Sequence, residues 1–370
     1  MGADQSGLAS ELKQLTAELA AIDGVSGHEQ AVVARLRELF EPLGGRVEID
    51  RFGNLYATTP GPQGAPSLMV SAHSDEIGAI VRGIEPSGLI RLAPVGGFLD
   101  KLATARHVRV RGRRGVIGVK SGHLQSPEER TRVTPMRDLY VDLGVGSADE
   151  VRALGIRVGD QITYDEPMVE LANPDRIAGK ALDNRIGCAV LVALARRLQG
   201  AALPCTLHLV VAVQEEVGLR GARVAAHRLN PTAAIVVDTA PAGGTPDVDY
   251  YKDLNMLIGA GPVLTLMSRG GSGGYIASPA MRDFVRGVAG QRGITVQEAV
   301  FLGGNSDAAS VHLEQDGIPT VAINLARRYS HSPVEMLDIN DACGAVTLLE
   351  AAARAFGPEV DLGFLNAEWG

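Results

Sequence analysis

The amino-acid sequence predicts an α/β protein with a mixed central sheet, helices on both faces of that sheet, and a small β-rich domain inserted into the chain. Three observations carry this prediction. Helical hydrophobic patterns alternate with apolar strands towards both ends of the chain, short strands with glycine-rich turns fill the middle, and ionisable residues follow several apolar strands. Alternating helices and strands are typical of a sheet that is covered by helices on both faces.

The sequence predicts helices and strands on both sides of the middle segment. Towards the N-terminus, helices are expected around 8–19 and over 29–43, and strands over 46–50, 54–58 and 67–73. In the second half, helices are expected over 183–198, over 219–229 and from about 340, and strands over 206–213, 233–237, 263–267, 295–300 and 320–324. The two ends together predict one catalytic domain made of residues 1–76 and 173–370.

Residues 77–172 differ from the rest of the chain in their pattern of apolar and polar residues. Alternating stretches such as "HVRVRG", "DLYVDLG" and "DQITYD" are separated by glycine, proline and charged turns. Short alternating strands at this spacing predict a β-rich insert.

Composition limits the possible partners and the compartment. The net charge of −8 over 370 residues argues against nucleic acid and acidic membranes, which select basic surfaces. No segment approaches the roughly 20 apolar residues that span a bilayer, and the N-terminus reads as an amphipathic helix rather than a signal sequence. The three cysteines are far apart, so we expect buried thiols in a cytoplasmic protein.

Ionisable side chains gather where the predicted strands end. In chain order they are His73, Asp75, Asp183, Glu215, Glu216, Asp238 and His331. Taken singly, each has an ordinary explanation as a turn, a helix cap or a hydrogen-bonded histidine. Ligand sites of open α/β sheets lie at the carboxyl ends of the strands, and a mixed set of imidazole and carboxylate groups suits zinc or cobalt.

Strand geometry suggests roles for some of these residues. His73 and Asp75 are two positions apart, so Asp75 can support the ring of a metal-bound His73. Glu215 and Glu216 are adjacent and point apart, so one can bind metal while the other faces a substrate. The charges of Asp183, Glu216, Asp238 and a bridging hydroxide balance two divalent ions rather than one.

Five motifs resemble those of a known enzyme family. "AHSDEIG", "ALDNRIG", "VQEEVGLRGA", "VVVDT" and "RYSHSPVE" are similar, in order and spacing, to motifs of the dinuclear metallo-aminopeptidases. This group contains the tetrahedral and glutamyl aminopeptidases, some of which were labelled endoglucanases. The resemblance implies a zinc-exopeptidase-like fold, an insert that serves as a dimerisation domain, and dimers that assemble into a hollow tetrahedral dodecamer.

The same resemblance implies a reaction and a role for each site residue. Peptides with a free N-terminus would lose N-terminal residues through attack by a hydroxide held between two zinc or cobalt ions. The implied ligands are His73 and Glu216 for one ion and Asp238 and His331 for the other, with Asp183 bridging. Glu215 would be the general base, and Asp75 would support His73.

The resemblance leaves the preferred N-terminal residue open. Ala326 and Arg327 stand where proline and a small residue are expected, and Ser306 precedes Asp307 where threonine is common. Arg269 and Arg327 would favour an acidic first residue if they face the substrate; otherwise they are solvated loop arginines.

Other functions would use some of the same residues. A serine hydrolase would combine Ser272 of "GGSGG" with Asp307 and His331, but the next helix start, at Ser278, comes late for a nucleophile turn. A related metal-dependent deacylase or carboxypeptidase would share the metal ligands. A non-catalytic assembly protein would be expected to lack Glu215 or a ligand, and all are present.

Overall fold

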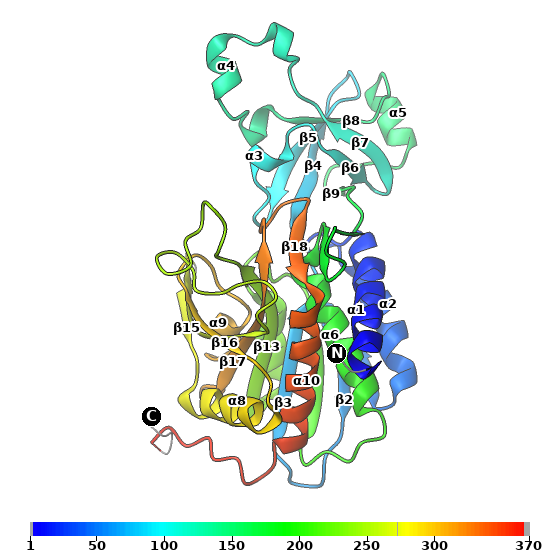
Figure 1. Cartoon of the computed structure of the whole chain (residues 1–370). Coiled ribbons are helices and arrows are strands. Elements are labelled where there is room, and N and C mark those ends of the chain that lie inside the picture. The colour runs from blue at the N-terminus through cyan, green and yellow to red at the C-terminus, as the bar shows by residue number, and fades with distance from the viewer. Residues whose placement is uncertain (1–2, 272, 366–370) are drawn as a thin grey trace.

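The computed structural model, which describes residues 3–271 and 273–365, folds into a large mixed sheet covered by helices, with a small barrel at one end (Figure 1). The order of strands along the sheet is β1-β2-β12-β3-β13-β17-β18-β11-β10, and β14 joins β15, β16 and β17. The strands are β1 (Arg46–Ile49), β2 (Leu55–Thr59), β3 (Ser67–His73), β10 (Val169–Glu170), β11 (Arg176–Gly179), β12 (Thr206–Ala212), β13 (Ala233–Pro241), β14 (Val263–Gly270), β15 (Gly273–Ile276), β16 (Gln297–Phe301), β17 (Thr320–Arg328) and β18 (Glu335–Asp338). The predicted fold class is confirmed.

Four parallel strands form the centre of this sheet. β12, β3, β13 and β17 are neighbours and run in the same direction. Their residues are almost entirely buried, because strands covered on both faces are apolar along their whole length rather than at alternate positions. The carboxyl ends of these four strands therefore meet along one edge.

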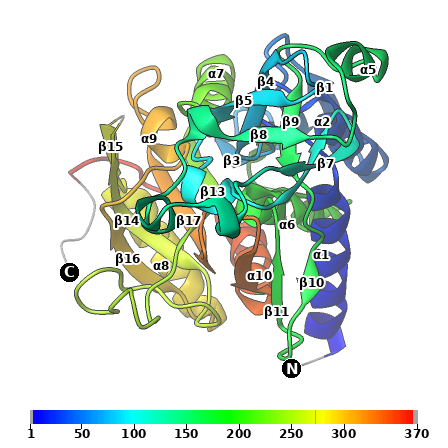
Figure 2. The ribbon, with the colours of Figure 1, turned by 90° about the horizontal axis from the view of Figure 1, so that it is seen from above.

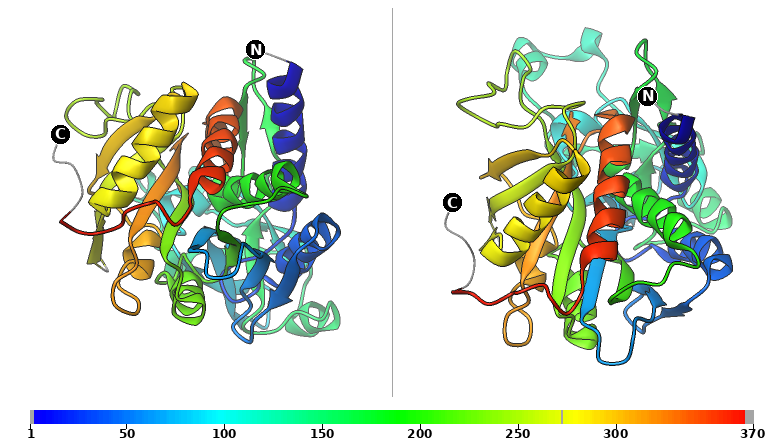
Figure 3. Two further views of the ribbon diagram at one scale, coloured as in Figure 1. Left: turned by 90° about the horizontal axis from the view of Figure 1, so that it is seen from below. Right: turned by 60° about the horizontal axis from the view of Figure 1, so that its bottom comes forward.

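Helices cover both faces of the sheet. The helices are α1 (Ala3–Ala21), α2 (Gln30–Phe40), α3 (Asp100–Ala103), α4 (Pro127–Thr131), α5 (Ala148–Ala153), α6 (Leu182–Leu198), α7 (Arg220–Leu229), α8 (Pro279–Arg292), α9 (Ala308–Val311) and α10 (Ile339–Ala355). One layer consists of α1, α6, α8 and α10, which pack side by side, and α7 and α9 lie on the opposite face (Figure 3). The apolar side chains between these layers form the main core.

The barrel stands over the edge at which the parallel strands end (Figures 1 and 2). Its six strands close in the order β4-β5-β8-β7-β6-β9. They are β4 (Gly78–Ile84), β5 (Ile90–Val95), β6 (His107–Val110), β7 (Arg113–Ile117), β8 (Tyr140–Asp142) and β9 (Gln161–Tyr164). The barrel has its own apolar core. Strand β10, which falls within the range 77–172 predicted as the insert, pairs with β11 in the main sheet.

Two further expectations concern helices and cysteines. Within the described residues, every helix is too short or too polar to cross a membrane. Cys188, Cys205 and Cys343 are buried free thiols, as their spacing predicted.

Candidate metal centre

The predicted site residues come together at the edge where the parallel strands end. His73 is the last residue of β3, Asp238 lies in β13, Glu215 and Glu216 follow β12, and Asp183 lies at the start of α6. His331 comes from the turn between β17 and β18. Residues far apart in the sequence thus form one cluster, because the parallel strands place their carboxyl ends side by side.

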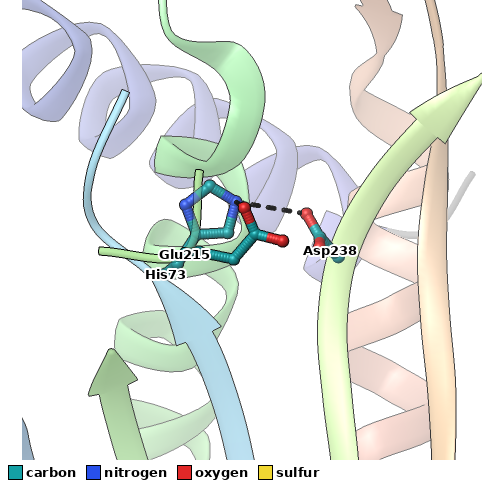
Figure 4. A group of neighbouring side chains, drawn as sticks. All are labelled: His73, Glu215 and Asp238. Atoms are coloured by element: carbon teal, nitrogen blue, oxygen red, sulfur yellow. Dashed lines mark ion pairs between the residues drawn. The ribbon is translucent and has the colours of Figure 1, made fainter. Parts of the chain in front are cut away.

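One group of possible ligands is made of His73, Glu215 and Asp238. Each offers a ligand atom within 4.8 Å of the others, and the three side chains point toward one another (Figure 4). His73 Nε2 lies 3.5 Å from Asp238 Oδ1 and 3.9 Å from Glu215 Oε2. The His73 side chain is only 2% exposed, so these charges face one another away from water.

A second group contains Asp183, Glu216 and His331. His331 Nε2 lies 3.4 Å from Asp183 Oδ2 and 3.5 Å from Glu216 Oε2. The other oxygen of Asp183, Oδ1, lies 3.2 Å from His73 Nε2. The carboxylate of Asp183 therefore reaches both groups, one oxygen to each.

The pairing implied by the resemblance is wrong in this structure. His73 groups with Asp238 rather than with Glu216, and His331 groups with Glu216 rather than with Asp238. The reason is strand order: β13 lies directly beside β3, and Val236 is level with Ser71. Asp238, two residues after Val236, therefore comes level with His73.

Asp75 holds both His73 and the pair of glutamates. Its Oδ1 lies 3.3 Å from His73 Nδ1 and accepts the backbone N–H of Glu215 at 3.0 Å. Its Oδ2 accepts the backbone N–H of Glu216 at 3.1 Å and the hydroxyl of Ser26 at 2.6 Å. Burial opposes ionisation, but His73 and these hydrogen bonds lower the pKa of Asp75 below its ordinary value. Sequence reasoning missed Ser26, which lies in the loop after α1.

Without a neutralising cation, ionisation of the Glu215 and Glu216 carboxylates costs free energy. Burial, with the carboxylates of Asp238 and Glu216 adding to it, raises the pKa of Glu215 well above its ordinary value. Burial, with Asp183 and Asp75 adding to it, raises the pKa of Glu216 to about 8. Like charges in a dry site repel unless a proton or a metal ion neutralises them.

Unpartnered buried atoms in the cluster also fit a metal centre. Among the described residues, Asp183 Oδ1 and Glu216 Oε1 are buried without a hydrogen-bond partner. Buried polar atoms normally have partners, so such orphans indicate an ion or water. Two imidazoles and several carboxylates form a donor set that suits a divalent ion such as zinc or cobalt.

The metal-free protein is expected to lose stability as the pH rises from 6.5 to 9. Although burial favours the neutral form, the carboxylates of Asp183 and Glu216 raise the pKa of His331 from 6.5 to about 9, and the pKa of Glu216 rises from 4.5 to about 8. A raised pKa in the folded state stabilises the fold below the unfolded pKa, and this contribution is lost as the pH rises through the folded pKa. Both groups therefore destabilise the fold across this range.

Thermal unfolding in a chelator measures this effect. The melting temperature should fall by about 5 °C or more between pH 6.5 and pH 9. Excess zinc should make the melting temperature less dependent on pH, because the metal ion replaces the protons that neutralise the carboxylates. A melting temperature that stays level or rises in the chelator would contradict the expected coupling.

Arg327 and Glu335 form a buried ion pair beside the cluster. Arg327 Nη2 lies 2.7 Å from Asp183 Oδ2, and the same guanidinium pairs with the Glu335 carboxylate. Glu335 also accepts the backbone N–H groups of Asp183 at 3.0 Å and of His331 at 2.9 Å. Arg327 is thus neither a solvated loop arginine nor a free cation. It fixes the orientation of Asp183, a role that no local pattern in the sequence indicates.

The barrel contributes a loop that closes over the second group. A Cβ atom at Gly97 would collide with the imidazole of His331, and one at Gly96 would lie 3.1 Å from the Glu216 Cβ. Gly96 and Gly97 follow β5, so the insert packs directly on two site residues. No pattern in the sequence indicated that these glycines belong to the site.

Replacing Gly97 by alanine is expected to displace His331 and weaken metal binding at the second group. Disturbing the surroundings of a ligand typically lowers metal affinity by about 10–100-fold. Calorimetric titration of the metal-free variant with zinc measures this loss. Gly122→Ala is the matched control, because its added Cβ meets no atom within 4 Å. Equal affinities of the two variants would show that the loop does not hold His331.

The serine-hydrolase alternative is not supported by the neighbours of His331. Its imidazole faces Asp183 and Glu216, and Ser272 lies outside the described residues. Asp307 is buried with both carboxylate oxygens unpartnered. Burial raises the pKa of Asp307 to about 8, with Asp238 and Asp75 adding to the effect against the opposing charge of His73.

Comparison with known proteins places the chain among aminopeptidases. Residues 53–348 match the M42 glutamyl aminopeptidase family. The putative aminopeptidase SgcX of Escherichia coli is 34% identical over 337 residues, which cover 90% of each chain. The glutamyl aminopeptidase of Lactococcus lactis is 33% identical over 356 residues, which cover 94% of this chain and 98% of the relative.

Solved structures of related proteins share the whole fold. An aminopeptidase from Desulfurococcus kamchatkensis superposes with a TM-score of 0.89 at 32% identity and covers 98% of both chains. The TET1 peptidase of Pyrococcus horikoshii, described as assembling into a tetrahedron or a large octahedral shell, gives a TM-score of 0.81 at 31% identity over 94% of this chain and 99% of that chain. The motifs, the fold and these relatives agree: the chain belongs to the M42 glutamyl aminopeptidase family and is a peptidase.

Proposed function

We propose that this chain is a dinuclear metallo-aminopeptidase that removes N-terminal residues from peptides with a free amino group. The observation that carries the proposal is the position of Asp183, whose two carboxylate oxygens reach two separate groups of buried ligands. His73 and Asp238 would hold one ion with Asp183 Oδ1, and Glu216 and His331 would hold the other with Asp183 Oδ2. Zinc and cobalt match these donors.

The side chains around the ions would have separate roles in catalysis. Two divalent ions, when bound, would acidify a water and polarise the peptide carbonyl. Glu215 lines the same cavity without being needed as a ligand, so its carboxylate can take the proton of the water and deliver it to the leaving amine. Asp75 keeps His73 and the amides of both glutamates in place, and Arg327 keeps Asp183 in place.

Hydrolysis of matched free and blocked substrates tests this function. The metal-loaded protein should release p-nitroaniline from leucine p-nitroanilide. It should leave N-acetyl-leucine p-nitroanilide intact, because an aminopeptidase recognises the free amine. A chelator should abolish the activity, and zinc or cobalt should restore it. Cleavage of the blocked substrate, or activity that survives metal removal, would contradict the proposal.

We further propose that copies of the chain assemble through the barrel into dimers and then into a dodecamer. What supports this is the likeness to the TET1 peptidase, whose description names a tetrahedron and an octahedral shell. Light scattering on the purified full chain measures the mass directly. A mass near twelve times 38.8 kDa is expected, and a stable monomer at micromolar concentration would rule the assembly out.

A further inference from the structure

The cavity beside the metal ligands continues beyond them. It encloses about 340 Å³, and the cluster residues form only part of its wall. Of the other described residues that line it, only Arg327 is charged; the remainder are glycines, small polar residues and the apolar side chains of Leu219, Pro241 and Phe301. A peptide that presents its first carbonyl to the ions would place its first side chain against part of this wall.

The large apolar side chains of this wall are Leu219, which precedes α7, and Phe301, which ends β16. The ring of Phe301 lies directly on the backbone of two glycines. A Cβ atom at Gly303 would come within 2.8 Å of the ring, and one at Gly304 within 2.9 Å. Any side chain at either position would have to displace the ring, so the two glycines keep an apolar surface open toward the cavity.

The Asn305 amide on this wall is already hydrogen-bonded inside the protein. The side chain of Asn305 donates to the carbonyl of Gly273 at 3.1 Å, and its oxygen lies 3.3 Å from the hydroxyl of Ser268. Asn305 thus ties the β16–α9 loop to the β14–β15 hairpin. These bonds help to set the shape of the cavity, and the amide offers no charge to pair with a charged ligand.

The arginines of this region are not available to an acidic substrate side chain. Arg327 lines the cavity, but it is 2% exposed and is paired with Asp183 and Glu335. Arg269 is exposed and lies outside the cavity wall. Among the described residues that line the cavity, every carboxylate belongs to the metal cluster, so a basic side chain would also find no separate partner.

We propose that the enzyme prefers peptides whose first residue is uncharged and apolar, such as leucine or phenylalanine, and that Leu219 and Phe301 contact this side chain. The inference rests on the proposed aminopeptidase function and names its substrate class. A charged side chain in this cavity would lose its hydration without gaining an ionic partner. The preference therefore differs from the one that the name of the glutamyl aminopeptidase from Lactococcus lactis states for that relative.

A panel of four p-nitroanilides tests the preference on the metal-loaded full chain. We expect kcat/KM for the leucine and phenylalanine substrates to exceed that for the glutamate and lysine substrates by about 100-fold. Equal or faster cleavage of the glutamate or lysine substrate would overturn the preference and leave the aminopeptidase function standing. Failure to cleave any of the four would overturn the aminopeptidase function and this inference with it.

Charge placed on the cavity wall tests the assigned contacts. Phe301→Lys and Leu219→Lys should each raise the ratio of kcat/KM for the glutamate substrate to that for the leucine substrate by about 10-fold, since each supplies the missing cation. Leu302→Lys is the matched control, because Leu302 is next in sequence, 67% exposed and outside the cavity wall. Leu302→Lys should show the same ratio of kcat/KM for the glutamate substrate to that for the leucine substrate as the unchanged protein. If neither cavity variant moves the ratio while both keep their thermal stability, the first side chain binds elsewhere.

Discussion

Replacing Glu215 by glutamine is expected to lower kcat by about 10²–10⁴-fold while the protein keeps both metal ions. The substitution conserves the volume of the side chain and removes the carboxylate that accepts and returns the proton. General acid–base catalysis typically contributes a rate factor of this size. Glu215 also belongs to the first group of possible ligands, with its Oε2 3.9 Å from His73 Nε2. Metal analysis together with steady-state kinetics on leucine p-nitroanilide distinguishes the two roles.

The neighbouring residue supplies the matched comparison. Glu216→Gln should lose metal from the second group, because the Glu216 carboxylate lies beside His331, and its activity should fall with its metal content. Excess zinc should partly rescue Glu216→Gln and leave Glu215→Gln inactive. A near-normal kcat for Glu215→Gln would exclude Glu215 as the base, and loss of metal from that variant would make it a ligand instead.

Replacing Asp183 by asparagine is expected to weaken both metal positions at once. Its two oxygens face the two groups, so the loss of one negative charge affects each ion. We expect the metal content after dialysis to fall below one ion per chain and kcat/KM to fall by at least about 10³-fold, because both ions would take part in the proposed chemistry.

The control for Asp183 is a carboxylate away from the site. Asp149→Asn changes a side chain that is 92% exposed in the barrel, and it should leave metal content and activity unchanged. If Asp183→Asn lost metal from one group only, Asp183 would serve a single ion and the bridging role would be wrong.

The elements next to the site were predictable because their apolar patterns are strong. The strand expected over 67–73 is β3 (Ser67–His73), and the helix expected over 183–198 is α6 (Leu182–Leu198). The strands expected to end at 237 and 324 instead continue to Pro241 and Arg328. They continue because Asp238 and Arg327 face partners within the protein, whereas charged residues in a sequence usually mark the end of a buried strand. The helix expected over 29–43 ends at Phe40, and Pro42 lies in the short 3-10 turn that follows.

The identity of the clustered residues was also predictable, but their partners were not. Positions after strands indicate which side chains reach one edge of the sheet. Which of them meet depends on the order of strands, and the adjacency of β3 and β13 decided that His73 lies beside Asp238. The pairing of Arg327 with Asp183 and the packing of Gly97 on His331 join segments that share no local signal. Such contacts arise only when the barrel and both ends of the chain are assembled.

Anomalous diffraction from crystals of the zinc-loaded protein is the most direct measurement of the central feature, two ions joined by one carboxylate. Two anomalous peaks should flank the Asp183 carboxylate, one between His73 and Asp238 and the other between Glu216 and His331. A single peak, or two peaks of which only one contacts Asp183, would contradict the account.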